Sequence, residues 1–231
     1  MTTCANCGHT GTGNYCSECG NSYRVKRITL SSIIHEATHT FTHLDTGFGY
    51  TLKELALHPG TMQKKYLSGE RSRYQKPFSM FFICASITAL AFYWITREAS
   101  GATHIEVTRE KFLKNYFVIL QCTLLPFFAL ITWVLFRNKT INYAEILVLF
   151  VYTLAFGFLT IIPINTLSMF SNWRWLPFLD LPVLGIYVIW TNLNFFNKQP
   201  AWIVILKSIF MLLIGWFASN IIAEQIVRWM L

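Results

Sequence analysis

Five long apolar runs between residues 78 and 231 constrain the fold more than any other feature of the sequence. A helix of about 20 apolar residues is needed to cross the hydrocarbon core of a bilayer. The runs are Phe78–Thr96, Tyr116–Phe136, Ile146–Phe170, Leu176–Phe196 and Trp202–Ile222. Because lipid offers no hydrogen-bond partner to the backbone, such segments must be helical. The sequence therefore predicts a mainly α, integral membrane helical bundle of about five transmembrane helices.

Two of these runs carry residues that disturb a simple span. The third is long and contains Pro163, which predicts a tilt, a kink or an early end. The fourth contains Asp180 and Pro182, so the sequence does not decide whether this segment crosses the membrane fully. The side on which the C-terminus lies depends on that crossing. The composition excludes the alternative of one soluble core, because only 13% of residues are charged, against roughly 25% in soluble domains.

The positive charge is concentrated ahead of the first apolar run. Nine of the 19 Lys and Arg residues lie between Arg24 and Lys76, and the formal net charge is +8. Basic segments beside a span favour the cytosolic face and its anionic headgroups. A basic segment could also bind nucleic acid, but its position next to the membrane favours lipid. With no basic and apolar leader at Met1, we expect a cytosolic N-terminus.

Residues 1–23 contain two closely spaced cysteine pairs. The sequence is Cys4-x-x-Cys7-Gly, followed by Cys16-x-x-Cys19-Gly. Each C-x-x-C-G turn points two thiolates at one centre, and four thiolates suit tetrahedral Zn²⁺. An iron centre or a redox dithiol is the alternative, although a thioredoxin-like context is absent. We predict a zinc-ribbon-like knuckle in which structural Zn²⁺ supplies most of the folding energy.

Residues 24–77 are predicted to form a basic, amphipathic juxtamembrane block. Thr29 is a candidate N-cap, and the apolar residues that follow recur at helical spacing up to Phe41. Two further short helices are expected over Thr51–Leu57 and Thr61–Leu67, separated by Pro59 and Gly60. Such helices tend to lie in the plane of the interface. Residues 78–231 form the transmembrane domain.

The block from Leu44 to Phe78 has a distinctive set of residues: Asp45, Gly47, Thr51, Leu55, Pro59, Gly60, Tyr66, Gly69, Arg71, Tyr74 and Pro77. With the cysteine pairs ahead of it, this block resembles a family of bacterial zinc-ribbon membrane proteins defined by a domain of unknown function. The resemblance covers about the first third of the chain. It implies a multi-pass protein of a bacterial inner membrane with cytosolic zinc binding, and it implies no activity.

His35, Glu36 and His39 match the H-E-x-x-H pattern of zinc metallohydrolases. On a helix the two His residues share a face, and the Glu can act as general base. A catalytic site also needs a third ligand, and His43 lies two turns from His35, too far along a straight helix. The favoured alternative is an amphipathic helix whose polar face meets the headgroups and whose His residues are aligned only by periodicity. A further alternative is a His row that binds metal weakly or senses pH.

Polar residues within the apolar runs raise a third function, transport of a small molecule or lipid. Asn165, Asp180 and Asn192 would have to converge on one cavity. Asp180 and Lys207 are predicted near opposite faces, with Lys207 extending to the cytosolic headgroups. The favoured hypothesis is instead a non-enzymatic platform, whose knuckle recruits a cytosolic protein partner or organises an assembly of unspecified stoichiometry.

Overall fold

The computed structural model describes residues 1–25, 27–33, 47–98, 117–137, 141–170 and 175–230. Within these ranges the chain is mainly helical, with one small ribbon of two strands near the N-terminus. The elements are β1 (Thr2–Thr3), β2 (Thr10–Gly11), α2 (Phe48–Leu57), α3 (Thr61–Ser68), α4 (Pro77–Glu98), α6 (Phe117–Leu135), α7 (Tyr143–Phe170), η2 (Leu176–Leu179), α8 (Asp180–Phe195) and α9 (Ala201–Met230).

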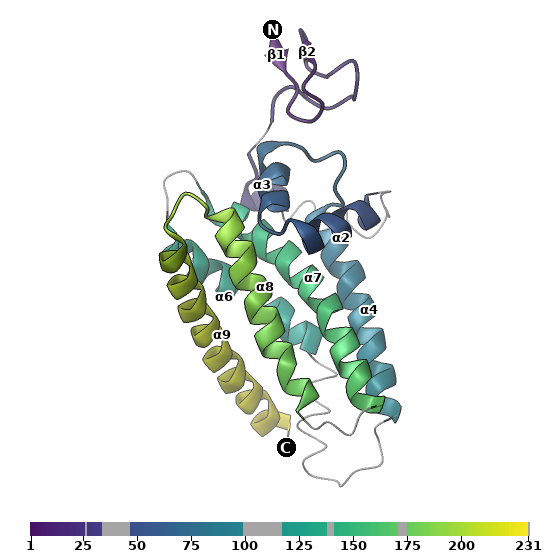
Figure 1. Cartoon of the computed structure of the whole chain (residues 1–231), viewed down its shortest axis with the longest axis vertical. Helices are drawn as coiled ribbons and strands as arrows, with labels where there is room; N and C mark the ends of the chain where they lie inside the picture. Colours follow the sequence, from purple (N-terminus) through teal and green to yellow (C-terminus); the bar gives the residue numbers. More distant parts are fainter. Residues whose placement is uncertain (26, 34–46, 99–116, 138–140, 171–174, 231) are drawn as a thin grey trace.

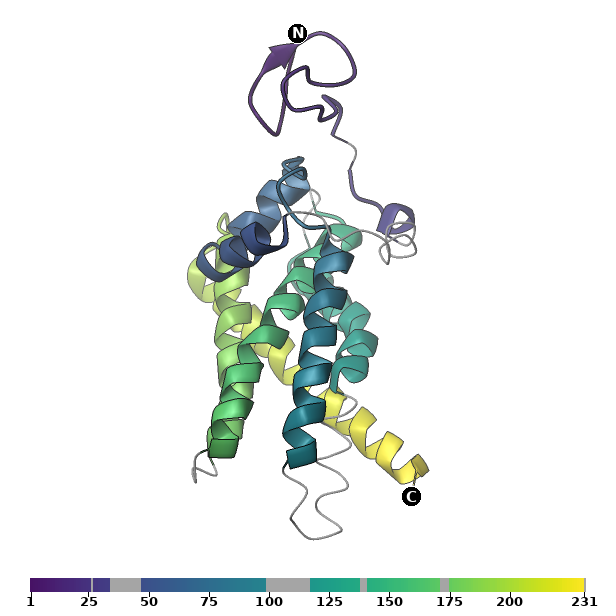
Figure 2. The ribbon, with the colours of Figure 1, turned by 90° about the vertical axis from the view of Figure 1, so that its right-hand side faces the viewer.

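Helices α4, α6, α7, α8 and α9 form a bundle whose members run along one long axis (Figure 1). Helix α7 is the central member, and it packs against α4, α6 and α8. Many of its side chains are fully buried, among them Val151, Tyr152 and Ala155. The N-terminus lies beyond one end of the bundle and the C-terminus at the other end (Figures 1 and 2).

Three helices of the described chain are long and apolar enough to cross a membrane. The qualifying segments are Pro77–Ile95, Tyr143–Ser168 and Ala201–Ile222. In α6 the described side chains form the shorter apolar segment Thr123–Leu135, and α8 has 16 residues. At 1.5 Å per residue α8 is about 24 Å long, less than the roughly 30 Å of a hydrocarbon core. Length and composition thus establish three membrane-length helices, fewer than the five predicted.

The prolines that cast doubt on two runs are accommodated in different ways. Helix α7 continues through Pro163 as far as Phe170, so the early end that we considered does not occur. Its packing between three neighbouring helices holds the segment together despite the hydrogen bond that proline removes. Pro182 falls in the first turn of α8, which starts at Asp180. In a first turn the missing N–H has no intrahelical partner to lose.

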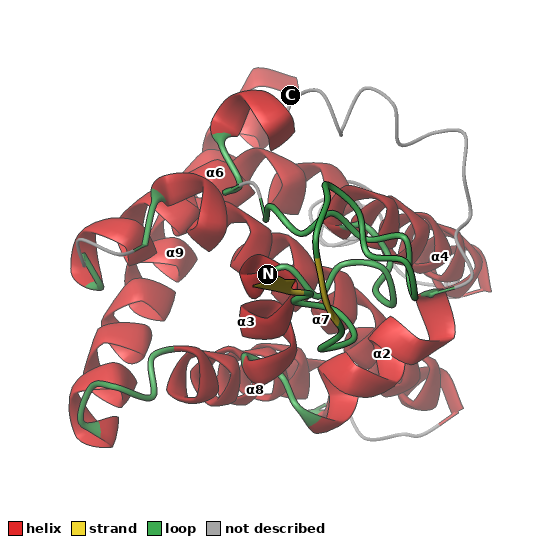
Figure 3. Ribbon diagram, turned by 90° about the horizontal axis from the view of Figure 1, so that it is seen from above, coloured by secondary structure: helices red, strands yellow, loops and turns green. Residues whose placement is uncertain are grey.

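Helices α2 and α3 lie across one end of the bundle (Figures 1 and 3). Together with the loop that follows α3 they form what we call the cap, residues 47–76. We expected these helices to lie in the plane of the membrane interface. In the structure Leu55 and Met62 are fully buried and belong to the same core as α7 and α8. The cap is therefore an integral part of the bundle.

Three hydrogen bonds fasten the cap to the bundle. The Tyr187 hydroxyl donates to the carbonyl of Leu55 at 3.0 Å. The Tyr152 hydroxyl donates to the carbonyl of Gln75 at 2.6 Å. The side-chain amide of Asn194 donates to the carbonyl of Pro59 at 2.8 Å. The Leu55 and Pro59 carbonyls lie at the end of α2, and the Gln75 carbonyl lies just before α4 begins. These bonds therefore fix the connections as well as the helices.

The helix expected from Thr29 is described only as far as Ile33. The backbone N–H of Ser32 donates to the Thr29 hydroxyl oxygen at 3.3 Å, which is the contact of an N-cap. The rest of that expected helix, including the H-E-x-x-H pentapeptide, lies outside the described residues.

The close approach of the cap to α8 makes a prediction at Gly60. This residue has φ 79° and precedes α3, and a Cβ added there would overlap the carbonyl oxygen of Thr191 and come 2.7 Å from the Phe195 nitrogen. We expect Gly60→Ala to lower the free energy of unfolding by about 2–4 kcal/mol, through backbone strain and overpacking. Gly49, in α2, has nothing within 4 Å of such a Cβ and is the matched control.

Thermal unfolding of the purified protein in detergent measures both variants. Gly49→Ala should unfold at the wild-type temperature or slightly above it, since alanine favours a helix by up to about 1 kcal/mol over glycine. Equal midpoints for the two variants would contradict the packing of α3 on the backbone of α8.

Candidate metal centre

The N-terminal knuckle, residues 1–23, is built from two turns of the same design. The amide of Gly8 donates to the carbonyl of Cys4 at 2.9 Å, and that of Gly20 donates to Cys16 at 2.8 Å. Both glycines have positive φ, 77° and 69°, which a side chain would disfavour. The C-x-x-C-G pattern thus produces two equivalent turns.

Each turn is closed by its own pair of extended residues. Strands β1 and β2 are antiparallel, with Thr3 opposite Thr10, and they flank the first turn. An isolated bridge between Tyr15 and Ser22 flanks the second turn. The ribbon thus encloses the first turn and the single bridge encloses the second.

The two turns bring all four cysteine sulfurs together. Every pair of the Sγ atoms of Cys4, Cys7, Cys16 and Cys19 lies within 4.8 Å. The Cys4–Cys19 and Cys7–Cys16 sulfur pairs are 3.6 and 3.5 Å apart. A tetrahedron with metal–sulfur distances of about 2.3 Å has sulfurs about 3.8 Å apart, whereas a disulfide needs about 2.05 Å. The cluster therefore fits a single tetrahedral metal ion.

The pKa values of two of the thiols are shifted in opposite directions. For Cys16, burial opposes ionisation, but backbone N–H groups of Cys19 and Glu18 donate to the sulfur and lower its pKa to about 6. For Cys7, the backbone near His9 favours the thiolate, but burial and hydrogen bonds with the other three cysteines raise its pKa to about 12. Without metal the cluster holds shared protons, and metal binding must displace them.

Tyr23 is the one large apolar side chain that packs with the sulfurs among the described residues. It is 7% exposed and forms a small cluster with Cys4 and Cys16. Burial first, and then the neighbouring Cys16, raise the pKa of its hydroxyl to about 12. A Cβ added at Gly11 would overlap this hydroxyl. So small a core cannot hold 23 residues in place, so a bound metal would supply most of the folding energy.

The residues proposed for transport do not converge. The Asn165 amide donates to Asp180 at 2.7 Å, joining α7 to the start of α8. Asn192 instead donates to the Ser208 hydroxyl at 2.9 Å. Asp180 and Asn192 lie twelve residues apart on α8, a rise of about 18 Å. The metallohydrolase residues His35, Glu36 and His39 lie outside the described residues.

A feature that the sequence analysis missed is a cavity of about 310 Å³ between the cap and the α8–α9 connection. Lys64 and Lys198 both line it, although 133 residues separate them. Lys198 follows an apolar helix, but Lys64 lies within the short polar helix α3, so no sequence pattern joins the two.

One comparison with known proteins gave a match. A family model described as a protein of unknown function, DUF3667, matches residues 45–89. The match spans the cap and the first half of α4, less than a third of the chain, and it does not reach the four cysteines. It overlaps the block from Leu44 to Phe78 that carries the resemblance and extends beyond it into α4, but it specifies neither a zinc ribbon nor a bacterial source. No curated protein and no solved structure matches the chain.

The shared protons of the cluster predict that metal affinity falls as pH falls. At least one thiol, Cys7, must lose a proton to bind, so apparent affinity should drop at least tenfold for each pH unit below about 7. The slope should steepen below about pH 6, where the Cys16 thiolate also becomes protonated.

Competition with a chromophoric chelator measures this dependence, and Co²⁺ loading reports tetrahedral thiolate ligation by its absorption. A Cys84→Ser variant serves as the control because Cys84 is buried in α4, away from the cluster. An affinity independent of pH would contradict thiolate ligation.

Proposed function

We propose that this protein is a non-enzymatic platform in a bacterial inner membrane. In this proposal the N-terminal knuckle holds a structural Zn²⁺ through Cys4, Cys7, Cys16 and Cys19 and faces the cytosol. Its surface recruits a protein partner, while the bundle fixes it to the membrane. Four thiolates in tetrahedral array are the donor set of structural zinc sites, which present surfaces more often than they perform chemistry.

The observation that carries the proposal is the position of the knuckle. It stands beyond the cap, outside the bundle (Figures 1 and 2). The Asn21 side-chain amide donates to the carbonyl of Gly69 in the cap at 3.3 Å, and Tyr15 on the knuckle is 71% exposed. A small metal-dependent unit held at a fixed distance from the bundle is well placed to meet a partner.

The arrangement of the bundle supports five crossings. Helix α8 is short, but α6 has 19 residues, and both pack against the membrane-length helices α7 and α9. Five crossings place the two termini on opposite sides, in agreement with their positions at opposite ends of the molecule (Figure 1). The basic residues between Arg24 and Lys76 then lie on the cytosolic side, as the positive-inside rule requires.

Topology reporters test this orientation. We expect a reporter that is active only outside the membrane to be silent at the N-terminus and active at the C-terminus, and a fluorescent cytosolic reporter to behave in the opposite way. Termini on the same side would contradict five crossings.

The role of the knuckle is tested by replacing Cys4, Cys7, Cys16 and Cys19 with Ser. We expect elemental analysis to find one zinc per chain in the wild type and none in the variant. The variant should remain inserted and helical, and its bundle should unfold at an unchanged temperature, because the knuckle contributes little to the core around α7. Loss of the folded bundle together with zinc would contradict a separable platform.

The same experiment decides between the platform and a metallohydrolase. Zinc that persists in the four-Ser variant and is lost on His35→Ala would overturn the platform proposal. It would require a hydrolase assay in which Glu36→Gln abolishes activity but retains metal.

A further inference from the structure

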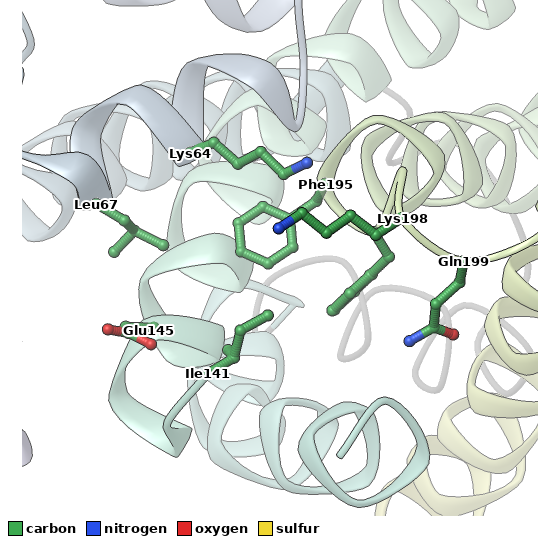
Figure 4. Close-up of a pocket in the computed structure, with 8 residues that line it drawn as sticks. Lys64, Leu67, Ile141, Glu145, Phe195, Lys198 and Gln199 are labelled. Atoms are coloured by element: carbon green, nitrogen blue, oxygen red, sulfur yellow. The ribbon is translucent and has the colours of Figure 1, made fainter. Parts of the chain in front are cut away.

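The cavity beside the cap has a polar half and an apolar half (Figure 4). Lys64 comes from α3, and Lys198 and Gln199 come from the α8–α9 connection. The apolar half is formed by Phe195, Phe196 and a residue that precedes α7, Ile141. Phe196 also stacks on Phe136 at a ring distance of 4.1 Å, which makes this half rigid.

The positive charges at the cavity are not neutralised by carboxylates. Among the residues that the structure describes, no acidic side chain lies within 4.0 Å of Lys64, Lys198 or Lys207. Lys64 donates to the Asn197 side-chain carbonyl at 2.6 Å, and Lys207 lies 3.5 Å from Gln199. Burial and then the charge of Lys198 lower the pKa of Lys64. Two ammonium groups thus face one opening without a counter-ion.

Glu145 also lines the cavity, but its carboxylate is paired with Arg27. Arg27 donates to both of its carboxylate oxygens, at 2.8 and 3.1 Å. The backbone N–H of Asn142 donates to one of them at 2.9 Å. In Figure 4 the carboxylate lies on the far side of the opening from the two lysine ammonium groups. The surplus positive charge therefore remains available to a ligand.

The cavity lies at the level where the membrane-length helices begin. Glu145 is two residues past the first residue of the span Tyr143–Ser168, and Gln199 is two residues before the span Ala201–Ile222. Trp202, 64% exposed, follows Gln199 by three residues, and tryptophan favours the headgroup level of a bilayer. An anionic group would meet the lysines here, and attached apolar carbons would meet the phenylalanines.

We propose that this cavity binds the phosphate group of an anionic phospholipid, with Lys64 and Lys198 contacting the phosphate. Phe195 and Phe196 contact the glycerol and the start of the acyl chains. A volume of about 310 Å³ accommodates a headgroup and not a whole lipid, so the chains extend into the bilayer. The inference rests on the membrane placement in the proposed function and not on the zinc knuckle.

Native mass spectrometry of the full-length protein in detergent tests the proposal by titration with phosphatidylglycerol and, separately, phosphatidylcholine. We expect the double variant Lys64→Gln, Lys198→Gln to bind phosphatidylglycerol at least tenfold more weakly, with phosphatidylcholine binding unchanged. The matched control is Lys53→Gln, Lys65→Gln, which removes the same charge from exposed positions of the cap. The control should bind phosphatidylglycerol like the wild type.

Equal losses in the two double variants would overturn the proposal, because they would indicate general surface attraction. Glycerol 3-phosphate is added as a competitor to distinguish the two sources of phosphate. Displacement of the lipid by an equal concentration of glycerol 3-phosphate would also overturn it, in favour of a soluble ligand.

The unfolding temperature of each variant shows whether a loss of binding reflects a loss of fold. If Lys64→Gln, Lys198→Gln does not fold, Lys198→Gln alone is used, since Lys198 lies in an exposed connection. The variant lacking the four knuckle cysteines should bind phosphatidylglycerol normally, so a failure of the platform proposal and a failure of this one are distinguishable.

Discussion

Hydrogen bonds from bundle side chains to the carbonyls of the cap are the interaction on which the rest of the structure depends. Tyr152 and Tyr187 are buried and donate from α7 and α8 to carbonyls at Gln75 and Leu55. These carbonyls lie where cap segments end, and an unpaired buried carbonyl costs about 1–3 kcal/mol. Fixing the cap in turn fixes Gly69, which contacts the knuckle, and Lys64, which faces the cavity. Both proposed sites are therefore positioned through the cap.

The sequence predicted the parts of the fold that depend on local pattern. Helices α4 and α7 begin within three residues of the predicted runs, because an apolar run of that length has one stable form in lipid. The cysteine cluster followed from the spacing of Cys4, Cys7, Cys16 and Cys19, since each turn closes through its own glycine. The short cap helices were also placed closely, by Pro59 and Gly60 at their junction.

What the sequence did not predict depends on contacts between distant segments. Thr51 and Gln63 are polar and lie on helices that were predicted to lie in the plane of the interface, yet both are fully buried. Hydrogen bonds within the cap accompany this burial. The Thr51 hydroxyl oxygen accepts from the backbone N–H of Gln75, and the Gln63 side-chain carbonyl accepts from the backbone N–H of Gly60. No hydrophobic pattern reveals such pairs. The cavity could not be predicted from the sequence either, because its walls come from three separate parts of the chain.

The same long-range contacts distinguish Lys64 from two arginines of the segment between Arg24 and Lys76. Arg27 is paired with Glu145, and Arg71 donates to the Tyr66 carbonyl at 3.2 Å while lying 5.6 Å from the Tyr66 ring. These arginines hold the segments ahead of the bundle in place. Lys64 instead has a neutral partner, Asn197. An arginine can satisfy several acceptors in a fixed geometry, whereas a lysine keeps a concentrated charge. Among the described residues Lys64 thus has no carboxylate partner, and it is suited to an anionic ligand. A uniformly basic surface would attract anions everywhere and would not direct one to the cavity.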